Sequence, residues 1–170
     1  MEGERELIMD AIKMIKDDHH RMKDLLHAFA DAGDDAFKVK QQTADQVFAE
    51  LEVHMTLEEE IFYPAVRAKT DGEGKSHVAE GAEEHHIAKI LIAELKKLTP
   101  EDEAFAAKFK VLSENVEHHM KEEEDELLPD AKKKLGHDGI EVLGEQMASR
   151  RQELEAAAVA SQGEERRVVA

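Results

Sequence analysis

Hydrophobic positions recur at steps of three and four residues through the segment VFAELEVHMTLEEEIFYP, residues 47–64. This spacing places side chains on one face of an α-helix and predicts that the face lies in the interior. The positions on it are Val47, Leu51, His54, Glu58, Ile61 and Ala65. A histidine and a glutamate therefore occupy expected core positions, although a buried carboxylate is costly unless a partner compensates its charge. The segment predicts a helix with a polar site in its buried face.

The same pattern occurs a second time between Phe105 and Pro129. Its inward positions are Phe105, Phe109, Leu112, Val116, His119, Glu123 and Leu127. Both copies contain His-Met-x-x-Glu, and in both the histidine lies ten residues before a proline. A further pair of segments, DDHHRMKDLL and EEHHIAKILI, matches at an offset of 66 residues and adds His19 and His85 on inward faces. This internal duplication predicts a helical hairpin that is used twice.

Turn and capping residues divide the chain into five expected helices, over about residues 5–31, 34–68, 77–98, 100–135 and 138–160. Pro64 is expected to kink the second helix or to end its regular part. The fold class predicted from this order is all-α, an antiparallel up-down four-helix bundle with an additional C-terminal helix. We expect the bundle over residues 1–135, the appended helix over 136–160 and a frayed or disordered tail over 161–170.

Composition and charge narrow the class of protein. Hydrophobic residues make up 41% and aromatic residues only 4% of the 170 residues, which favours an aliphatic, helical core. A net charge of −17 repels polyanions, so neither nucleic acid nor an anionic membrane is expected as a partner. The chain has no cysteine, which excludes disulfides, thiolate catalysis and cysteine-ligated clusters. No signal peptide and no bilayer-spanning apolar run is evident, so we expect a cytoplasmic protein. The sequence gives no indication of its oligomeric state.

The inward polar residues form a candidate set of metal ligands without sulfur. They are His19, His54, Glu58, His85, His119 and Glu123. Imidazole and carboxylate groups suit iron, manganese or zinc. Six ligands are too many for one tetrahedral ion and too few to saturate two octahedral ions. We therefore expect two ions, with Glu58 and Glu123 as bridging ligands, terminal histidines and an oxo or hydroxo bridge from solvent. Iron is our choice because it adds redox chemistry, while manganese and zinc remain alternatives.

Other polar residues near these positions have simpler explanations. A single inward histidine is better explained as a core side chain that bonds to the backbone, and only four on matching faces favour ligation. His20 and His86 are expected beside the ligands or at the surface. Glu59, Glu60, Glu122 and Glu124 are expected on outer faces. Tyr63, the only tyrosine, is expected to pack at the helix end unless it lies within reach of the metals.

With these residues in place, the sequence resembles the hemerythrin-like HHE cation-binding domain over roughly residues 10–135. The resemblance rests on His19, His54-x-x-x-Glu58, His85 and His119-x-x-x-Glu123, and on the segments DHHRMKDLL, EEEIFYPAV and EEHHIAKIL. It implies a non-heme di-iron centre in a four-helix bundle. Members of the family bind oxygen, sense oxygen or iron, respond to nitric oxide, or decompose peroxide.

Two features depart from the oxygen-carrying hemerythrins. The carriers have a fifth histidine one turn before the ligand of the third helix, where this sequence has Gly81. Their second carboxylate is usually an aspartate five residues beyond its histidine, whereas Glu123 lies four residues beyond His119. His118 would restore the step of five residues and is therefore the alternative to His119. Both departures favour similarity to the HHE proteins with four histidines and two glutamates.

We therefore expect a di-iron protein of the oxidative or nitrosative stress response that decomposes peroxide. No catalytic side chain is assigned, and the ligand is expected to be peroxide or a small diatomic molecule. The alternative is a module that binds oxygen or nitric oxide for sensing or storage without turnover. A third hypothesis is a helical adaptor whose histidines are purely structural.

Overall fold

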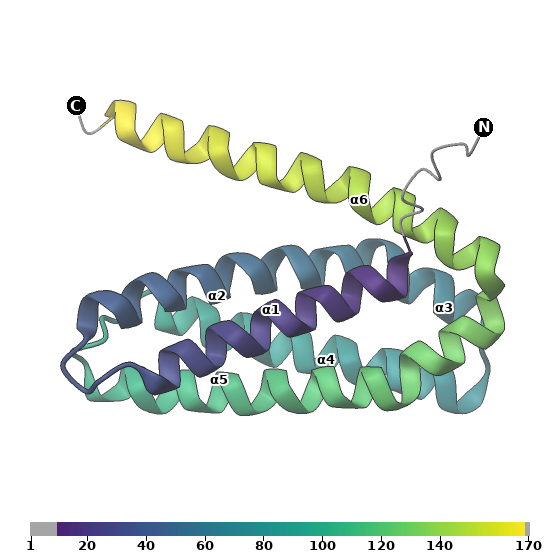
Figure 1. Ribbon diagram of the computed structural model, residues 1–170, viewed down its shortest axis with the longest axis horizontal. Helices are drawn as coiled ribbons and strands as arrows, with labels where there is room; N and C mark the ends of the chain where they lie inside the picture. Colours follow the sequence, from purple (N-terminus) through teal and green to yellow (C-terminus); the bar gives the residue numbers. More distant parts are fainter. Residues whose placement is uncertain (1–9, 169–170) are drawn as a thin grey trace, which may run out of the picture.

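The computed structural model describes residues 10–168 of the chain, with side chains described up to Ser161. The first bundle helix is α1 (Ala11–Asp31). The second is formed by α2 (Phe37–Leu57), the π-helical turn η1 (Glu58–Phe62) and α3 (Tyr63–Lys69), and the third is α4 (Gly72–Leu95). The fourth consists of α5 (Glu103–Glu122), the π-helical turn η2 (Glu123–Leu127) and the start of α6 (Leu128–Val168). These four run antiparallel to one another, as Figure 1 shows, so the predicted bundle is confirmed.

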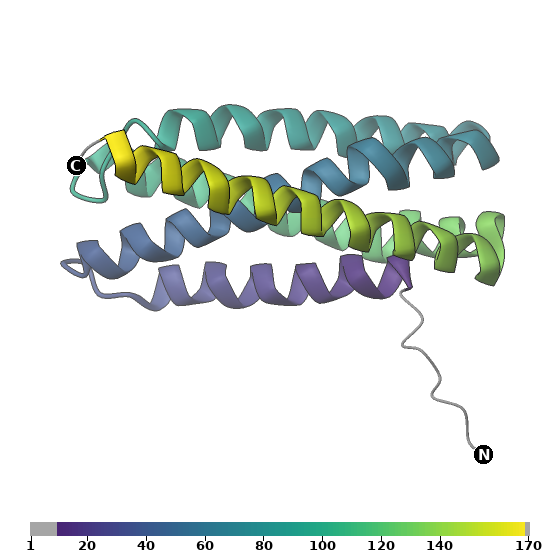
Figure 2. The same ribbon diagram turned by 90° about the horizontal axis from the view of Figure 1, so that it is seen from above.

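The remainder of α6 is the additional C-terminal helix. The chain turns at Gly136, where φ is +67°, a backbone conformation that favours glycine. Beyond this turn α6 runs back over α1 and α2, and its far end diverges from the bundle (Figures 1 and 2). The helix continues to Val168, beyond the expected end at residue 160 and into the segment that was expected to be a frayed or disordered tail. The division of the chain at residues 135 and 160 stays a prediction.

Three helix starts differ from the expected positions, namely those of α4, α5 and α2, which begins at Phe37 and not at about residue 34. The expected start of the first helix at residue 5 lies outside the described residues, within which α1 follows the N-cap Asp10. Helix α4 begins five residues early, at Gly72, so only Thr70 and Asp71 separate it from α3. Helix α5 begins late because Asp102 is its N-cap and also accepts hydrogen bonds from the backbone N–H and hydroxyl of Thr99.

The π-helical turns η1 and η2 lie at equivalent places in the second and fourth helices, and each begins at a candidate glutamate ligand. A π-helical turn holds more residues than an α-helical turn and so rotates the positions that follow it. From Glu59 to Val66 the buried residues are consequently Phe62, Tyr63 and Val66. Ile61 and Ala65 are only half-buried. The helix also continues past Pro64 to Lys69, so the proline does not end it.

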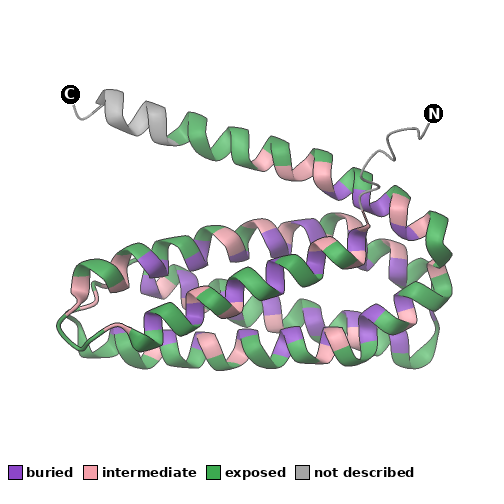
Figure 3. Cartoon of the chain, in the orientation of Figure 1, coloured by how far each residue is buried: buried purple, intermediate pink, exposed green. Residues whose placement is uncertain are grey.

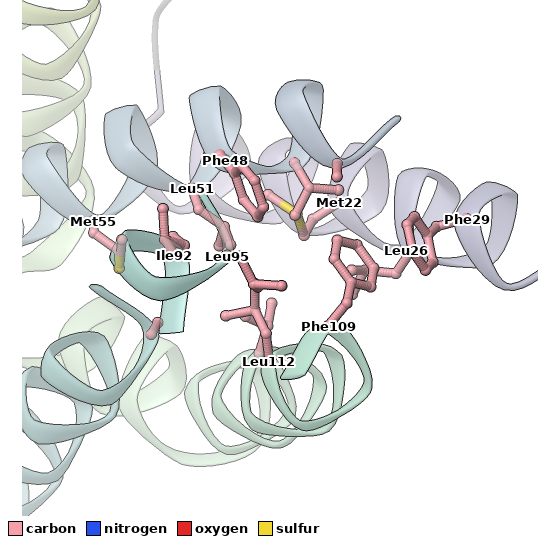
Figure 4. Packing of buried hydrophobic residues seen from close by; sticks show 14 of the residues in the cluster. Met22, Leu26, Phe29, Phe48, Leu51, Met55, Ile92, Leu95, Phe109 and Leu112 are labelled. Atoms are coloured by element: carbon pink, nitrogen blue, oxygen red, sulfur yellow. The ribbon is translucent and has the colours of Figure 1, made fainter. Parts of the chain in front are cut away.

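The apolar core consists of two clusters. One lies towards the α1–α2 loop and includes Phe29 and Phe109, whose rings stack with centroids 3.6 Å apart (Figure 4). The other lies towards the opposite end, where Phe62 and Leu127 meet Met147 of α6. Between them the inward faces, which Figure 3 shows as buried on every helix, carry polar side chains. Among residues 10–168, no helix is both long enough and apolar enough to cross a membrane.

Candidate metal centre

The six candidate ligands converge in one layer between the two apolar clusters. His19 lies on α1, His54 on α2, His85 on α4 and His119 on α5, and Glu58 and Glu123 are the first residues of η1 and η2. None of the six is more than 5% exposed. On α1 the layer lies between Ile15 of one cluster and Met22 of the other. The structure therefore brings together every residue that the sequence proposed for the site.

The ring nitrogens of the histidines face the two carboxylates. Glu58 Oε2 lies 3.4 Å from His54 Nε2, 3.2 Å from His85 Nε2 and 3.9 Å from His119 Nε2. Glu123 Oε2 lies 3.3 Å from His19 Nε2 and 3.5 Å from His119 Nε2. Two ligand atoms that share an ion at about 2.1 Å lie roughly 3.0–3.4 Å apart at the usual coordination angles. Most of these separations are therefore close to those of ligand atoms around a common ion.

The donor atoms form two groups, and within each group all atoms lie within 4.8 Å of one another. The first group contains His19, His54, Glu58 and Glu123, and the second contains Glu58, His85 and His119. Glu58 belongs to both groups, as a carboxylate that bridges two ions would. The arrangement can therefore accommodate a pair of ions.

Several of these buried atoms have no hydrogen-bond partner among the described residues. They are Nε2 of His19 and His54, both carboxylate oxygens of Glu58, and Oε2 of Glu123. An unsatisfied buried polar group costs about 1–3 kcal/mol, and a charged one costs more. Cations bound between these atoms would remove that cost. Nitrogen and oxygen donors of this kind fit iron, manganese or zinc.

The layer also attracts positive charge. Burial alone would raise the pKa of Glu58, but the nearby histidines, His54 foremost, hold it well below its ordinary range. Burial would likewise lower the pKa of His119, but the charge of Glu123, the nearby carboxylate of Glu58 and the hydrogen bond to Glu84 raise it well above the ordinary value. Glu58 is thus ionised at neutral pH, and either protons on the neighbouring histidines or metal ions compensate its charge.

The outer nitrogen of each histidine contacts a carboxylate. The four Nδ1 contacts are His19 with Glu124 at 2.9 Å, His54 with Asp18 at 3.4 Å, His85 with Glu59 at 3.0 Å and His119 with Glu84 at 2.7 Å. A carboxylate in this position holds a proton on Nδ1 and leaves the lone pair of Nε2 for a metal ion. All four rings are therefore oriented as metal ligands require.

These four carboxylates link the helices in a closed ring. Asp18 and Glu84 precede His19 and His85 in the sequence, and Glu59 and Glu124 follow Glu58 and Glu123. Each belongs to one helix and bonds to the histidine of the next, in the order α1, α2, α4, α5 and back to α1. The expectation that Glu59 and Glu124 lie on outer faces was therefore wrong. Both are half-buried at boundaries between helices. The sequence signal for this ring was an acidic residue next to four of the six inward positions.

Tyr63 lies within reach of the layer at the start of α3. Its hydroxyl donates a hydrogen bond to Glu123 Oε1 at 2.9 Å, which leaves Glu123 Oε2 facing His19 and His119. Its ring stacks on that of His85, with centroids 5.4 Å apart. Burial and the charges of Glu58 and Glu123 raise the pKa of Tyr63 well above its ordinary value, so the hydroxyl stays protonated. Tyr63 therefore fixes the orientation of one candidate ligand.

Gly81 leaves room for the hydroxyl of Tyr63, because a Cβ atom at position 81 would lie 2.7 Å from that oxygen. We expect Gly81→Ala to lower the free energy of unfolding by about 1–2 kcal/mol, since the clash outweighs the gain in helix propensity. The cost should fall when Tyr63→Phe is also present, which a double-mutant cycle measured by urea denaturation would show. Equal costs in both backgrounds would contradict this account of Gly81.

The remaining histidines near the layer do not enter it. His118 is 60% exposed on its side chain and contacts Glu122, so His119 is the one that faces the candidate ligands. His20 is exposed and bonds through Nδ1 to the carbonyl oxygen of Lys16, and His86 is exposed as well. The structure thus places His119, and not the alternative His118, beside Glu123.

A narrow cavity adjoins the layer on the side of the first apolar cluster. Its apolar wall consists of Met22, Leu51, Met55, Ala88, Val116 and Met120. The rest of the lining is polar and consists of the four inward histidines with Asp18, Glu84 and Asn115. The volume open to the centre of a water-sized molecule is about 10 Å³, close to what a single water molecule requires. A molecule bound beside the histidines on this side therefore has to be small.

Comparison with known proteins identifies a matching protein family. The model of the hemerythrin HHE cation binding domain matches residues 10–131. Over 134 residues the chain is 28% identical to a DNA nickase from Nostoc sp., an alignment that covers 79% of this chain and 36% of that protein. The chain thus spans about a third of the length of that relative.

A solved structure has the same fold. It is the crystal structure of a hemerythrin HHE cation binding domain-containing protein from Mycobacterium kansasii, with a TM-score of 0.75 and 22% sequence identity. The superposition covers 89% of this chain and 90% of the other. This likeness supports the helical arrangement described above.

Proposed function

Because the chain belongs to the hemerythrin HHE cation-binding domain family, we propose that it is a non-heme di-iron protein that acts on small oxidants. The proposed iron ligands are His19, His54, Glu58, His85, His119 and Glu123. The observation that carries the proposal is the state of Glu58. It is fully buried, both of its oxygens lack a hydrogen-bond partner among the described residues, and it belongs to both donor groups.

The two donor groups suggest how the ligands divide. His19 and His54 would hold one ion and His85 and His119 the other, with the carboxylates of Glu58 and Glu123 between them. The four carboxylates that contact the histidine Nδ1 atoms keep every Nε2 directed inward. The hydrogen bond from Tyr63 to Glu123 Oε1 keeps the other oxygen of Glu123 directed inward as well. Bound iron supplies reversible ferrous–ferric redox chemistry to this layer.

Hydrogen peroxide is the oxidant that we favour. Its disproportionation turns two peroxide molecules into two waters and one dioxygen, so the second peroxide is the reductant and no organic substrate is required. The small size of the cavity beside the histidines favours a reactant of few atoms, such as peroxide. In addition, the hydroxyl of Tyr63 occupies the space beside Gly81, where an oxygen carrier has a fifth histidine.

The second candidate is a module that binds oxygen or nitric oxide without turnover. The observation that favours it is the apolar wall of the cavity, which suits an uncharged diatomic molecule. We do not extend the activity named for the Nostoc relative to this chain. The alignment covers 36% of that protein, and a net charge of −17 opposes the approach of a polyanion.

Iron loading tests the proposal. We expect the purified protein, loaded anaerobically with ferrous iron and desalted, to retain about two iron ions per chain. It should then release oxygen from repeated additions of peroxide, as recorded with an oxygen electrode. Glu58→Ala should abolish this release, whereas Glu52→Ala, on the same helix and exposed, should not.

The other outcomes separate the candidates. A stable change of the visible spectrum in air or nitric oxide, without oxygen release from peroxide, would support the binding module. A protein that retains no iron, manganese or zinc after loading would contradict both candidates and leave the helical adaptor.

A further inference from the structure

Asp18 differs from the other three carboxylates of the ring. It is buried, with 5% exposure, whereas Glu59, Glu84 and Glu124 are half-buried. The cations beside Glu59 and Glu124 are lysines, but Asp18 pairs with two arginines, Arg21 on one oxygen and Arg151 on the other. The oxygen that accepts from Arg151, Oδ2, is also the one that contacts His54 Nδ1. One carboxylate oxygen therefore connects α6 to a candidate ligand.

Arg151 lies where α6 leaves the bundle. Earlier in the helix Ile140, Leu143 and Met147 are buried against the second apolar cluster, and Leu154 packs partly against it. From Glu155 to Ser161 every residue is exposed, and the helix diverges from α1 and α2 (Figures 1 and 3). The bond from Arg151 to Asp18, 2.5 Å long, is thus among the last contacts that hold α6 to the bundle.

The neighbouring Arg150 provides a contrast within the same turn. Its guanidinium bonds to Glu60, which is exposed and forms no hydrogen bond or ion pair with a histidine among the described residues. Both arginines therefore attach α6 to the bundle through a carboxylate, but only Arg151 does so through a carboxylate that also contacts a candidate ligand.

Removal of Arg151 would leave the Asp18 carboxylate with one arginine partner in place of two. Arg21, half-exposed and bonded to the other oxygen, would be the remaining cation beside this buried carboxylate. Asp18 would then be held through Oδ1 alone, and no arginine would fix Oδ2 opposite His54, whose Nδ1 contact is already the longest of the four at 3.4 Å. His54 would then lose the partner that orients its ring.

We propose that Arg151 is a positioning residue of the metal centre, which acts through Asp18 on His54 and so makes the affinity for metal depend on the docking of α6. The inference rests on the proposed di-metal function and adds a regulatory element to it. By thermodynamic linkage, metal bound at the His19–His54 group favours docked α6 to the same extent as docked α6 favours the metal.

Zinc titration against a chromophoric chelator tests the effect on affinity. We expect Arg151→Met to weaken binding of one of the two ions by about 10- to 100-fold, the usual effect of losing a partner of a ligand histidine. Arg151→Lys should restore part of the loss, because lysine keeps the charge but offers no forked donor. The matched control, Arg150→Met, should bind both ions as the wild type does.

Nitrogen-15 NMR of the histidine rings in the metal-free protein tests the orientation directly. We expect Arg151→Met to shift the His54 ring signals and to leave those of His85 and His119 unchanged, while Arg150→Met shifts none of the three. Equal zinc affinity and an unchanged His54 signal in Arg151→Met would overturn the inference. So would equal effects of Arg150→Met, since these would reflect undocking of α6 in general.

Two further outcomes remain decisive. If circular dichroism shows that Arg151→Met does not fold, Arg151→Lys decides. An intermediate loss of zinc affinity and an intermediate shift of the His54 signals in Arg151→Lys would support the inference. Wild-type affinity and wild-type His54 signals in Arg151→Lys would overturn it. If the wild-type protein binds no metal, the proposed function fails, and the NMR comparison alone decides whether Arg151 orients His54.

Discussion

Glu58→Gln is expected to reduce the bound metal from about two ions per chain to one or none. The substitution keeps the shape of the side chain but removes the negative charge and one acceptor oxygen from the residue shared by both donor groups. Metal analysis after desalting measures the loss directly. The exposed Glu52→Gln, on the preceding helix segment α2, is the control and should retain both ions.

Thermal unfolding gives an independent measurement of the same loss. A ligand at one hundred times its dissociation constant stabilises the folded state by about 2.7 kcal/mol. We therefore expect added metal to raise the Tm of the wild type and of Glu52→Gln, and to have little effect on Glu58→Gln. Two retained ions in Glu58→Gln would show that Glu58 is not a bridging ligand.

Phe109→Ala is expected to lower the free energy of unfolding by about 3–5 kcal/mol. Phe109 is almost fully buried in the first apolar cluster, where its ring stacks on Phe29 and packs beside Phe105 and Phe48. Truncation to alanine leaves a cavity that four surrounding helices can close only in part. Urea denaturation followed by circular dichroism measures the change.

Val111→Ala is the matched control for this loss. Val111 lies on the same helix two residues away but is 51% exposed, so its truncation should change stability by less than about 0.5 kcal/mol. Phe109 is also about 15 Å along the helix from His119. The folded Phe109→Ala protein should therefore retain its metal, and a cost below 1 kcal/mol would contradict the packing described for this cluster.

The hydrophobic pattern was sufficient to predict the helices and the six inward polar residues. Helices of this length have a regular period, so His19 or His119 could be placed on an inward face from spacing alone. The duplication then aligned the two halves and brought the four histidines to one depth. The structure confirms the bundle and places all six residues together.

The features that spacing missed depend on local backbone or on neighbouring helices. A π-helical turn changes the period for only a few residues, so the shift from Ile61 to Phe62 was not visible in the pattern. The contacts of Glu59 with His85 and of Glu124 with His19 join helices far apart in the sequence, and periodicity within one helix carries no information about them. They became visible only when the four helices were packed.

The ring of carboxylates has the symmetry of a dimer. Asp18 bonds to His54 within the first hairpin and Glu84 to His119 within the second, while Glu59 and Glu124 reach across to the opposite hairpin. An approximate two-fold axis that exchanges the hairpins thus exchanges every one of these bonds. Two copies of a single hairpin, paired about that axis, would reproduce the complete layer in the manner of an isologous homodimer. Half of the present chain would then have been enough to build the site, and the fusion of two halves would have freed each to acquire its own partners, such as Arg151 beside Asp18.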